Sequence, residues 1–349
     1  MVGLVAGIGE FIGYSLRLLS GYLSDRTQRY WALTLIGYGI LFSIPLLASA
    51  GEWQVAVLLI ILERMGKGIR TPARDTILSY ATSQTGRGVG FGLHEALDQI
   101  GAIIGPLIFT FVFLMGGGYR EGFSILWVPA LLCILTLLIA RKQFPQPEKL
   151  EVQLISKEKK LLEKPKDRNV FYLYMGFTCF SVMGLVSFQI IAYHFKIHSV
   201  IPEAQIPLFY AIAMGVDAIV AILIGKAYDR LGLITLIAIP VLTLPIPFIA
   251  FIDRYAFALL AVLLWGAVLG IHETIMRAAL ADLVPVERRG VVYGIFNTLY
   301  GFSWFIGSLS AGILYDLNRV YLIAFVVVSE MIAVSVFMVF RKNFYTSGI

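Results

Sequence analysis

Long apolar stretches recur along the whole chain and constrain its fold more than any other feature. A helix needs about 20 mostly apolar residues to cross the hydrocarbon core of a bilayer. Eleven stretches meet this need, at about 2–22, 31–50, 53–78, 88–115, 122–140, 170–195, 205–225, 233–252, 255–281, 290–315 and 320–340. Apolar residues make up 58% of the chain and charged residues 14%, with a mean hydropathy of +0.82. Soluble domains have roughly half apolar and a quarter charged residues. The sequence therefore predicts an all-α polytopic membrane protein.

One polar segment, residues 141–169, separates five predicted spans from six. Its prolines and its many Lys and Glu residues predict a cytoplasmic linker, with a surface helix around Leu150–Leu162. In that orientation about 18 Lys and Arg residues face the cytoplasm. The opposite side receives only four, which are Arg120, Lys196, Arg254 and Arg319. We therefore expect a plasma-membrane protein with a cytoplasmic C-terminus and, because the span count is odd, an N-terminus outside. The net charge of +6 then reflects topology, and nucleic-acid binding is not expected.

The two halves of the chain repeat each other in parallel orientation. A Gly-x-x-x-Asp-Arg loop occurs twice, at Gly21, Asp25 and Arg26 and again at Gly225, Asp229 and Arg230. The segments 87–92 and 289–294 share a second pattern, Arg-Gly-x-x-x-Gly, at nearly the same offset. Two matching signatures indicate a tandem duplication.

The repeat also leaves the first half one span short. The Asp-Arg loop follows two spans in the second half but only one span in the first. Two explanations remain open. Either a further helix lies upstream of Met1, which we favour, or a second chain or lipid fills its place. Without such cover, Glu10 and Arg17 would face hydrocarbon, at a cost of at least about 2.5 kcal/mol each.

Three motifs in order resemble the major facilitator superfamily. The loop at 21–29 is similar to the signature between family helices 2 and 3, although Gln28 stands where the family pattern has Gly. The segment Arg64–Gly68 is similar to the helix-4 signature. A third set resembles the helix-5 signature of the antiporters, without its final Gly pair; it comprises Gly92, Gly101, Gly105 and Pro106.

The resemblance implies two pseudo-symmetric helix bundles. Residues 1–140 would form an N-terminal bundle of family helices 2–6, and residues 170–349 a C-terminal bundle of helices 7–12, joined by the linker at 141–169. The spans at 53–78 and 255–281 would be helices 4 and 10, which line the central path in this family. A carboxylate at Asp25 or Asp229 would meet the N-terminus of a neighbouring helix and latch one conformation. The alternative is that Asp25 only ends a helix and binds loop donors.

Charged residues inside the membrane are costly, so they indicate a cavity or a partner. They concentrate in the same two spans, as Glu63, Arg64, Lys67, Arg70, Arg74 and Asp75 and as His272, Glu273 and Arg277. The spacing predicts the pairs Glu63/Lys67 and Glu273/Arg277, which are four residues apart. A stripe of bases with two acids suits an anionic or zwitterionic solute, or a proton-coupled site.

Structural interpretations stay open for part of this set. Arg70, Arg74 and Asp75 could form a gate and a cytoplasmic anchor that never touch the solute. His94 and Asp98 could form a proton relay, a metal half-site or, as we favour, a structural pair. His194 and His198 share the same spacing, but no metal site is expected there.

No motif for catalysis, ATP binding or any cofactor is found in the sequence. The favoured function is a secondary active transporter that exports a small amphipathic or anionic solute in exchange for protons. The alternatives are an importer or facilitator of a small organic anion, and a non-transporting sensor or scaffold. The expected partners are the solute, protons and the lipid bilayer; the sequence does not define the oligomeric state.

Overall fold

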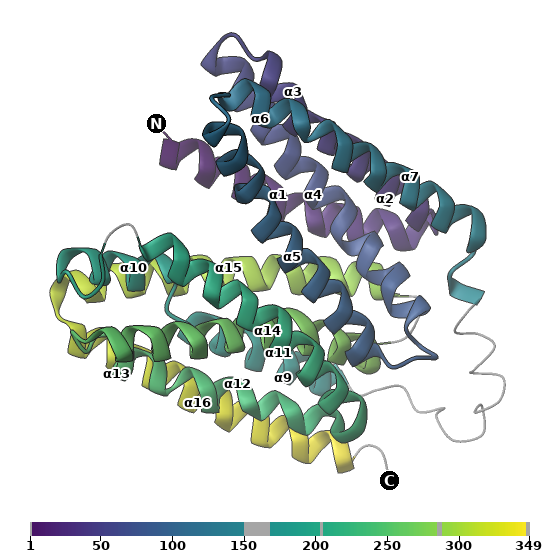
Figure 1. Ribbon diagram of the computed structural model, residues 1–349. Helices are drawn as coiled ribbons and strands as arrows, with labels where there is room; N and C mark the ends of the chain where they lie inside the picture. The colour runs from purple at the N-terminus through teal and green to yellow at the C-terminus, as the bar shows by residue number, and fades with distance from the viewer. Residues whose placement is uncertain (1, 150–167, 203–204, 285–287, 347–349) are drawn as a thin grey trace. The chain divides into compact units, whose positions relative to one another are not determined.

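The protein is described from a computed structural model that covers residues 2–149, 168–202, 205–284 and 288–346. Within these ranges, burial and side-chain contacts are described for Gly13 and from residue 16 to residue 344, except at Arg168. The surface helix expected around Leu150–Leu162 and the side chain of Glu10 therefore lie outside the described residues. In the described part every regular element is helical (Figure 1).

Each of the eleven predicted spans coincides with a helix or a short series of helices. The continuous ones are α1 (Val2–Thr27), α4 (Trp53–Ala81), α5 (Arg87–Leu114), α11 (Ile206–Leu231), α14 (Tyr255–Leu283), α15 (Arg289–Leu317) and α16 (Arg319–Thr346). Within the described part of the chain, seven helical stretches are apolar and long enough to cross a membrane, and one of these, Ile206–Ala250, has 45 residues. The prediction of a polytopic helical membrane protein is confirmed.

Four predicted spans are built from shorter helices. Residues 30–49 form α2 (Tyr30–Gly39), η1 (Ile40–Phe42), α3 (Ser43–Leu46) and η2 (Leu47–Ser49). Residues 119–143 form α6 (Tyr119–Ile125) and α7 (Trp127–Gln143), and residues 168–197 form α9 (Arg168–Gly184) and α10 (Phe188–Ile197). The span after α11 consists of η4 (Gly232–Ile237), α12 (Ala238–Thr243) and α13 (Pro245–Ala250). Pro240, Pro245 and Pro247 explain the last series, because proline lacks the N–H that continues a helix.

The chain divides into two compact units. Unit 1 comprises Met1–Gln84, Ile104–Lys159 and Pro285–Thr298, and unit 2 comprises Thr85–Ile103, Lys160–Val284 and Leu299–Ile349. The helices α5 and α15, which correspond in the repeat, each begin in one unit and end in the other. The division into bundles at 1–140 and 170–349 stays a prediction.

Within unit 1, α4 is the central helix and packs against both α1 and α2. A Cβ atom at Gly66 would lie 2.8 Å from the carbonyl oxygen of Gly37 on α2. A Cβ atom at Gly68 would lie 2.6 Å from the carbonyl oxygen of Gly13 on α1. Such close approach needs small residues, since lipid supplies no hydrophobic drive for helix association. The glycines on either side of Lys67 thus each allow one neighbouring helix to pack closely against α4.

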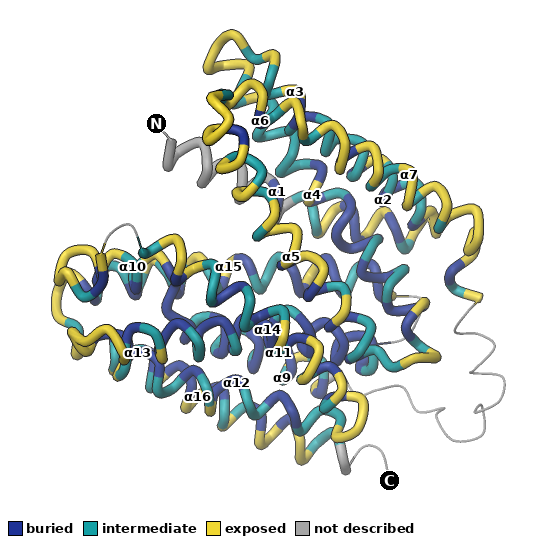
Figure 2. Tube along the Cα trace, viewed as in Figure 1, coloured by how far each residue is buried: buried dark blue, intermediate teal, exposed yellow. Residues whose placement is uncertain are grey.

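Within unit 2, α14 is largely buried. It packs against α11, and Figure 2 shows most of its trace in the colour of buried residues. Of its most apolar stretch, 56% is buried, compared with 6% for the stretch that holds α6 and α7 in unit 1. Arg277 and His272 are therefore held in a packed interior.

Candidate functional site

The charged turn of α4 lies in unit 1 and is organised around Glu63. Its carboxylate lies 3.6 Å from Nε of Arg64 and 3.9 Å from Nη2 of Arg70. Arg70 also donates to the carbonyl oxygen of Gly37 at 3.3 Å, and its guanidinium lies 4.6 Å from the ring centre of Tyr38. The structure thus pairs Glu63 with two arginines, and the Glu63/Lys67 pair stays a prediction.

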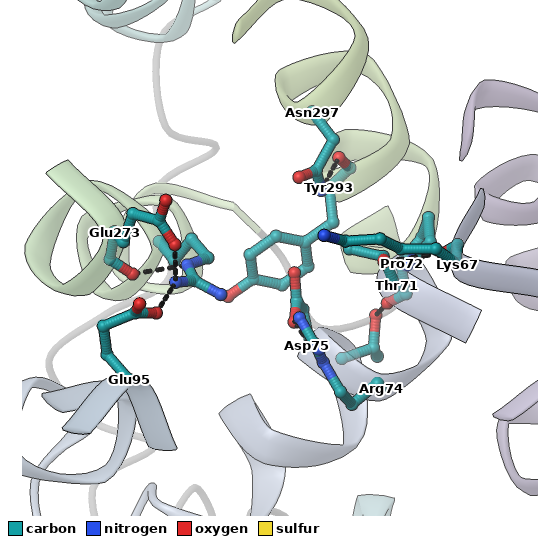
Figure 3. A network of polar contacts seen from close by, with 11 residues as sticks. Lys67, Thr71, Pro72, Arg74, Asp75, Glu95, Glu273, Tyr293 and Asn297 are labelled. Carbon is teal, nitrogen blue, oxygen red and sulfur yellow. Dashed lines mark hydrogen bonds and ion pairs between the residues drawn. The ribbon is translucent and has the colours of Figure 1, made fainter. Parts of the chain in front are cut away.

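Arg74 and Asp75 form a second pair on α4. Nε and Nη2 of Arg74 both donate to Oδ1 of Asp75, at 3.0 Å and 2.8 Å. Asp75 is fully buried, so the adjacent guanidinium supplies the charge that a buried carboxylate requires. Figure 3 shows both side chains together with Lys67 and Thr71 of the same helix.

In unit 2, Arg277 binds two acids at once. Its Nη2 lies 2.5 Å from Oε2 of Glu95 on α5 and 3.4 Å from Oε2 of Glu273 on its own helix. The predicted Glu273/Arg277 pair is therefore present. Glu95 is only 1% exposed, and Gln99 donates to its other oxygen at 2.8 Å. Figure 3 shows Glu95 and Glu273 on either side of one guanidinium group.

Glu95 is absent from the site that the sequence predicted. In the sequence it is one of several isolated polar residues on a membrane helix, and its partner Arg277 lies 182 residues away. The available signals were its four-residue spacing from Gln99 and its position one turn after Gly92. The acid–base network of Glu95, Gln99, Glu273 and Arg277 is called the Arg277 network below.

Two further polar side chains lie on α14 or against it. His272 is buried, and its Nδ1 lies 3.5 Å from the hydroxyl of Tyr300. Asp217 on α11 is fully buried with no hydrogen-bond partner among the described residues, and it lies against Gly270 of α14. Asp217 is the second buried acid that the predicted site omitted.

Asp25 binds the beginning of α15 within unit 1. Its two carboxylate oxygens accept hydrogen bonds from the backbone N–H groups of Gly290 at 2.8 Å and Val291 at 2.7 Å. The backbones are so close that a Cβ atom at Gly21 would overlap the carbonyl oxygen of Gly290. A carboxylate is stabilised at this position because it accepts hydrogen bonds from N–H groups that have no partner within the helix, and because it lies at the positive end of the helix dipole.

Asp229 makes the same arrangement within unit 2. It accepts hydrogen bonds from the N–H groups of Gly88 at 2.7 Å and Val89 at 2.8 Å, at the beginning of α5. A Cβ atom at Gly225 would overlap the carbonyl oxygen of Gly88. The repeat therefore extends from sequence to contacts, and each aspartate anchors the beginning of one helix that ends in the other unit.

The arginines near these loops differ in their contacts. Arg26 and Arg230 are exposed, and neither forms an ion pair within the described residues. Arg87 pairs with Asp282, which also accepts a hydrogen bond from the Tyr228 hydroxyl at 2.7 Å.

The glycines of the helix-5 motif have unlike surroundings. A Cβ atom at Gly92 would overlap the carbonyl oxygen of Ala221 on α11. At Gly101 and Gly105 it would meet nothing within 4 Å among the described residues. Pro106 lies inside the continuous helix α5, and the hydroxyl of Thr110 donates to its carbonyl oxygen at 3.1 Å.

His194 and His198 share the carboxylate of Asp253. Nε2 of His194 lies 3.0 Å and Nδ1 of His198 lies 3.8 Å from it, and Nδ1 of His194 lies 2.7 Å from the Tyr315 hydroxyl. Across the described part of the chain, no three His, Cys, Asp or Glu side chains are grouped to hold a metal ion.

The family model described as Major Facilitator Superfamily matches residues 1–308. The chain belongs to this superfamily. Membership makes it an integral membrane protein of a family of solute transporters, as the motifs at 21–29 and 64–68 indicated.

Relatives of this transporter occur in bacteria and archaea. An uncharacterized protein of Mycobacterium tuberculosis (strain ATCC 25618 / H37Rv) is 39% identical over 336 residues, which cover 95% of this chain and 82% of the relative. An uncharacterized MFS-type transporter of Methanocaldococcus jannaschii is 29% identical over 328 residues, which cover 91% of this chain and 80% of the relative.

Solved structures share the fold at low identity. The human organic anion transporter MFSD10 (TETRAN) superposes with a TM-score of 0.72 at 14% identity, over 97% of this chain and 83% of that one. The proton:xylose symporter XylE superposes with a TM-score of 0.66 at 16% identity, over 95% of this chain and 84% of that one. A two-bundle major facilitator fold therefore fits this protein.

Proposed function

We propose that this transporter is a secondary active exporter that exchanges a small anionic or amphipathic solute for protons. The observation that carries the proposal is the Arg277 network, in which one buried guanidinium binds two carboxylates. One base cannot neutralise two acids, so the network holds an excess negative charge unless a proton binds. Buried acids next to a base are the usual chemistry of proton pathways in transporters.

A second buried acid outside the Arg277 network could also bind and release a proton. Asp217 adds a second fully buried acid on α11, which packs against the helix that carries Arg277. A carboxylate without partners in a packed interior is far more stable as the neutral acid. A proton that moves between Asp217 and Glu95 would change the charge of the network by one unit, which is the coupling that exchange requires.

The charge of α4 supports an anionic solute. The helix carries four bases, Arg64, Lys67, Arg70 and Arg74, against two acids, Glu63 and Asp75. Both acids are already paired with arginines, so the surplus charge of this segment is positive. A structural relative is named as an organic anion transporter. The export direction rests on the resemblance of Gly92, Gly101, Gly105 and Pro106 to the antiporter motif.

Transport by purified protein in liposomes would test the proposal. With a pH-sensitive dye inside and an imposed pH gradient, we expect each accepted organic anion to speed proton movement across the membrane. Glu95→Gln keeps the shape of the side chain but cannot release a proton. We expect it to lower solute-driven proton movement by at least about tenfold while solute counterflow continues.

A matched control is Glu52→Gln, because Glu52 is exposed at the beginning of α4. This variant should transport like the unmodified protein. Proton movement that stays normal in Glu95→Gln would remove the Arg277 network from coupling. Solute uptake without any proton movement would indicate a facilitator, and the absence of both would indicate a sensor or scaffold.

A further inference from the structure

The helical segment at 168–197 is interrupted inside the packed interior of unit 2. The helix α9 ends at Gly184 and α10 begins at Phe188, so residues 185–187 are not helical. Val182, Leu185, Val186 and Ser187 are all buried. An interruption at this depth leaves backbone groups without helical partners in a place that water does not reach.

The backbone hydrogen bonds around the interruption depart from the helical pattern. The N–H of Leu185 donates to Val182 at 3.4 Å, and bonding resumes where Ile190 and Ile191 donate to Ser187. The carbonyl of Val186 accepts from the indole of Trp265 at 2.9 Å. Residues 185–187 therefore fall outside the regular hydrogen-bond pattern of α9 and α10.

The carboxyl group of Glu330 lies at this interruption. Glu330 is on α16, which packs against α9, and its side chain is 0% exposed. A Cβ atom at Gly184 would overlap Oε1 of Glu330 and lie 3.0 Å from its carboxyl carbon, so the carboxyl group lies directly on the last residue of α9. Neither oxygen of Glu330 has a hydrogen-bond partner among the described residues.

Two hydroxyl groups on α9 also lack hydrogen-bond partners in the described chain. The hydroxyls of Thr178 and Ser181 are buried and have no hydrogen-bond partner in the described chain. Ser187, which precedes α10, is buried and its side chain makes no capping hydrogen bond. The carboxyl group of Glu330 therefore lies at Gly184, one helical turn after Ser181, and neither the Glu330 carboxylate nor the Ser181 hydroxyl has a hydrogen-bond partner in the described chain.

Among the described side chains of the neighbouring elements, no charged group balances Glu330. It faces α9, η4, α12 and α13, the elements packed against α16. The last three carry no titratable residue, and α9 carries Arg168, whose side chain is not described, Tyr172, Tyr174 and Cys179. Tyr172 is 65% exposed, and Tyr174 packs on Phe340, ten residues from Glu330 along α16. On α15, which meets α9 where Gly307 contacts Met183, no charged residue lies between Arg289 and Asp316.

We propose that Glu330 and the interruption between α9 and α10 form a binding site for a sodium ion. One carboxylate supplies one negative charge, which suits a monovalent cation. An all-oxygen set of ligands suits a hard cation rather than a transition metal. Carbonyl oxygens freed by an interrupted membrane helix serve as Na⁺ ligands in transporters of other folds. When sodium is absent, a proton neutralises Glu330.

Thermal unfolding of the detergent-purified protein tests the site, because an ion that binds only the native state raises the melting temperature. At pH 8 we expect NaCl to raise the melting temperature above that in equal KCl or choline chloride, by about 2–4 °C once sodium is about fivefold above its dissociation constant. At pH 5.5 the rise should be smaller, because protons compete for Glu330.

Three variants make the test specific. Glu330→Gln should lose the sodium-dependent rise. Ser181→Ala, which changes no charge, should weaken sodium binding by about tenfold. If Glu330→Gln does not fold, binding of radioactive sodium to Ser181→Ala and to the unmodified protein gives a second measurement. Asp316→Asn removes an exposed acid of α15 and should respond to sodium like the unmodified protein. The proposal is overturned if potassium or choline stabilises the protein as much as sodium does, if acid stabilises it but sodium at pH 8 does not, or if both site variants keep the full response to sodium.

Discussion

Single atoms decide where the helices of this transporter can meet. On α4 and α1, glycines occupy positions at which any side chain would meet a backbone oxygen of the neighbouring helix. Elsewhere, glycines of the same family motifs lie in open space, as at Gly101. The motif alone therefore does not show which glycine is needed, and substitution with alanine separates the two cases.

Gly21→Ala is expected to destabilise the protein, whereas Gly101→Ala is not. The new Cβ atom at residue 21 would overlap the carbonyl oxygen of Gly290, and overpacking of this kind costs about 1–3 kcal/mol. At residue 101 the substitution meets nothing and gains up to about 1 kcal/mol from helix propensity. Melting temperatures of the two variants should move in opposite directions. Equal effects would mean that α1 and α15 are not in close contact.

At the scale of single residues, charge pairing also explains why Glu95 can be buried. It is bound by Arg277 and Gln99, so its two oxygens are both satisfied. Glu330 and Asp217 are equally buried without such partners in the described chain. The three acids therefore differ in what must neutralise them, which is a guanidinium for Glu95 and a proton or a cation for the other two.

At the scale of elements, α5 and α15 are held at their beginnings by two equivalent aspartates. Asp25 binds two N–H groups of α15, and Asp229 binds two N–H groups of α5. Both contacts lie at the ends where the helix dipole is positive, so one physical interaction occurs once in each unit. We propose that these contacts act as the conformational latch that the family resemblance implies.

Asp25→Ala should therefore lower both stability and transport. Loss of a side chain that caps a helix N-terminus costs about 0.5–2 kcal/mol. We expect a lower melting temperature and slower transport in liposomes, and roughly additive stability losses when Asp229→Ala is combined, because the two contacts lie in separate units. Arg26→Ala is the control, since Arg26 is exposed. If Asp25→Ala and Arg26→Ala behaved alike, Asp25 would only end its helix.

At the scale of the whole molecule, the distribution of Lys and Arg predicts how the protein lies in the membrane. The predicted cytoplasmic side carries about 18 such residues and the other side four. The segment at 141–169 and the C-terminus should therefore face the cytoplasm.

Single cysteines report this orientation. The two natural cysteines, Cys133 and Cys179, are first replaced by serine. Lys142→Cys should then react with a membrane-impermeant maleimide only in inverted vesicles, and Arg120→Cys only in intact cells. Both positions are exposed in the structure, so failure to react would reflect sidedness. The reverse pattern would invert the proposed topology.

The amino-acid sequence by itself determined the number of spans, the internal repeat and the family. These features depend on local composition and on spacing along the chain, since about 20 apolar residues cross a bilayer whatever their neighbours are. It also indicated the Glu273/Arg277 pair, because four residues bring two side chains to the same helix face.

Only the tertiary structure decided which distant residues meet. Glu95 and Arg277 are 182 residues apart, and Asp25 and Gly290 are 265 apart. The interruption at 185–187 became informative only when Glu330 of the last helix was seen to lie on it. Such contacts depend on how helices pack, and packing is set by the shapes of surfaces that no local pattern encodes. For this reason the acids of the predicted site were incomplete, although the helices that carry them were predicted.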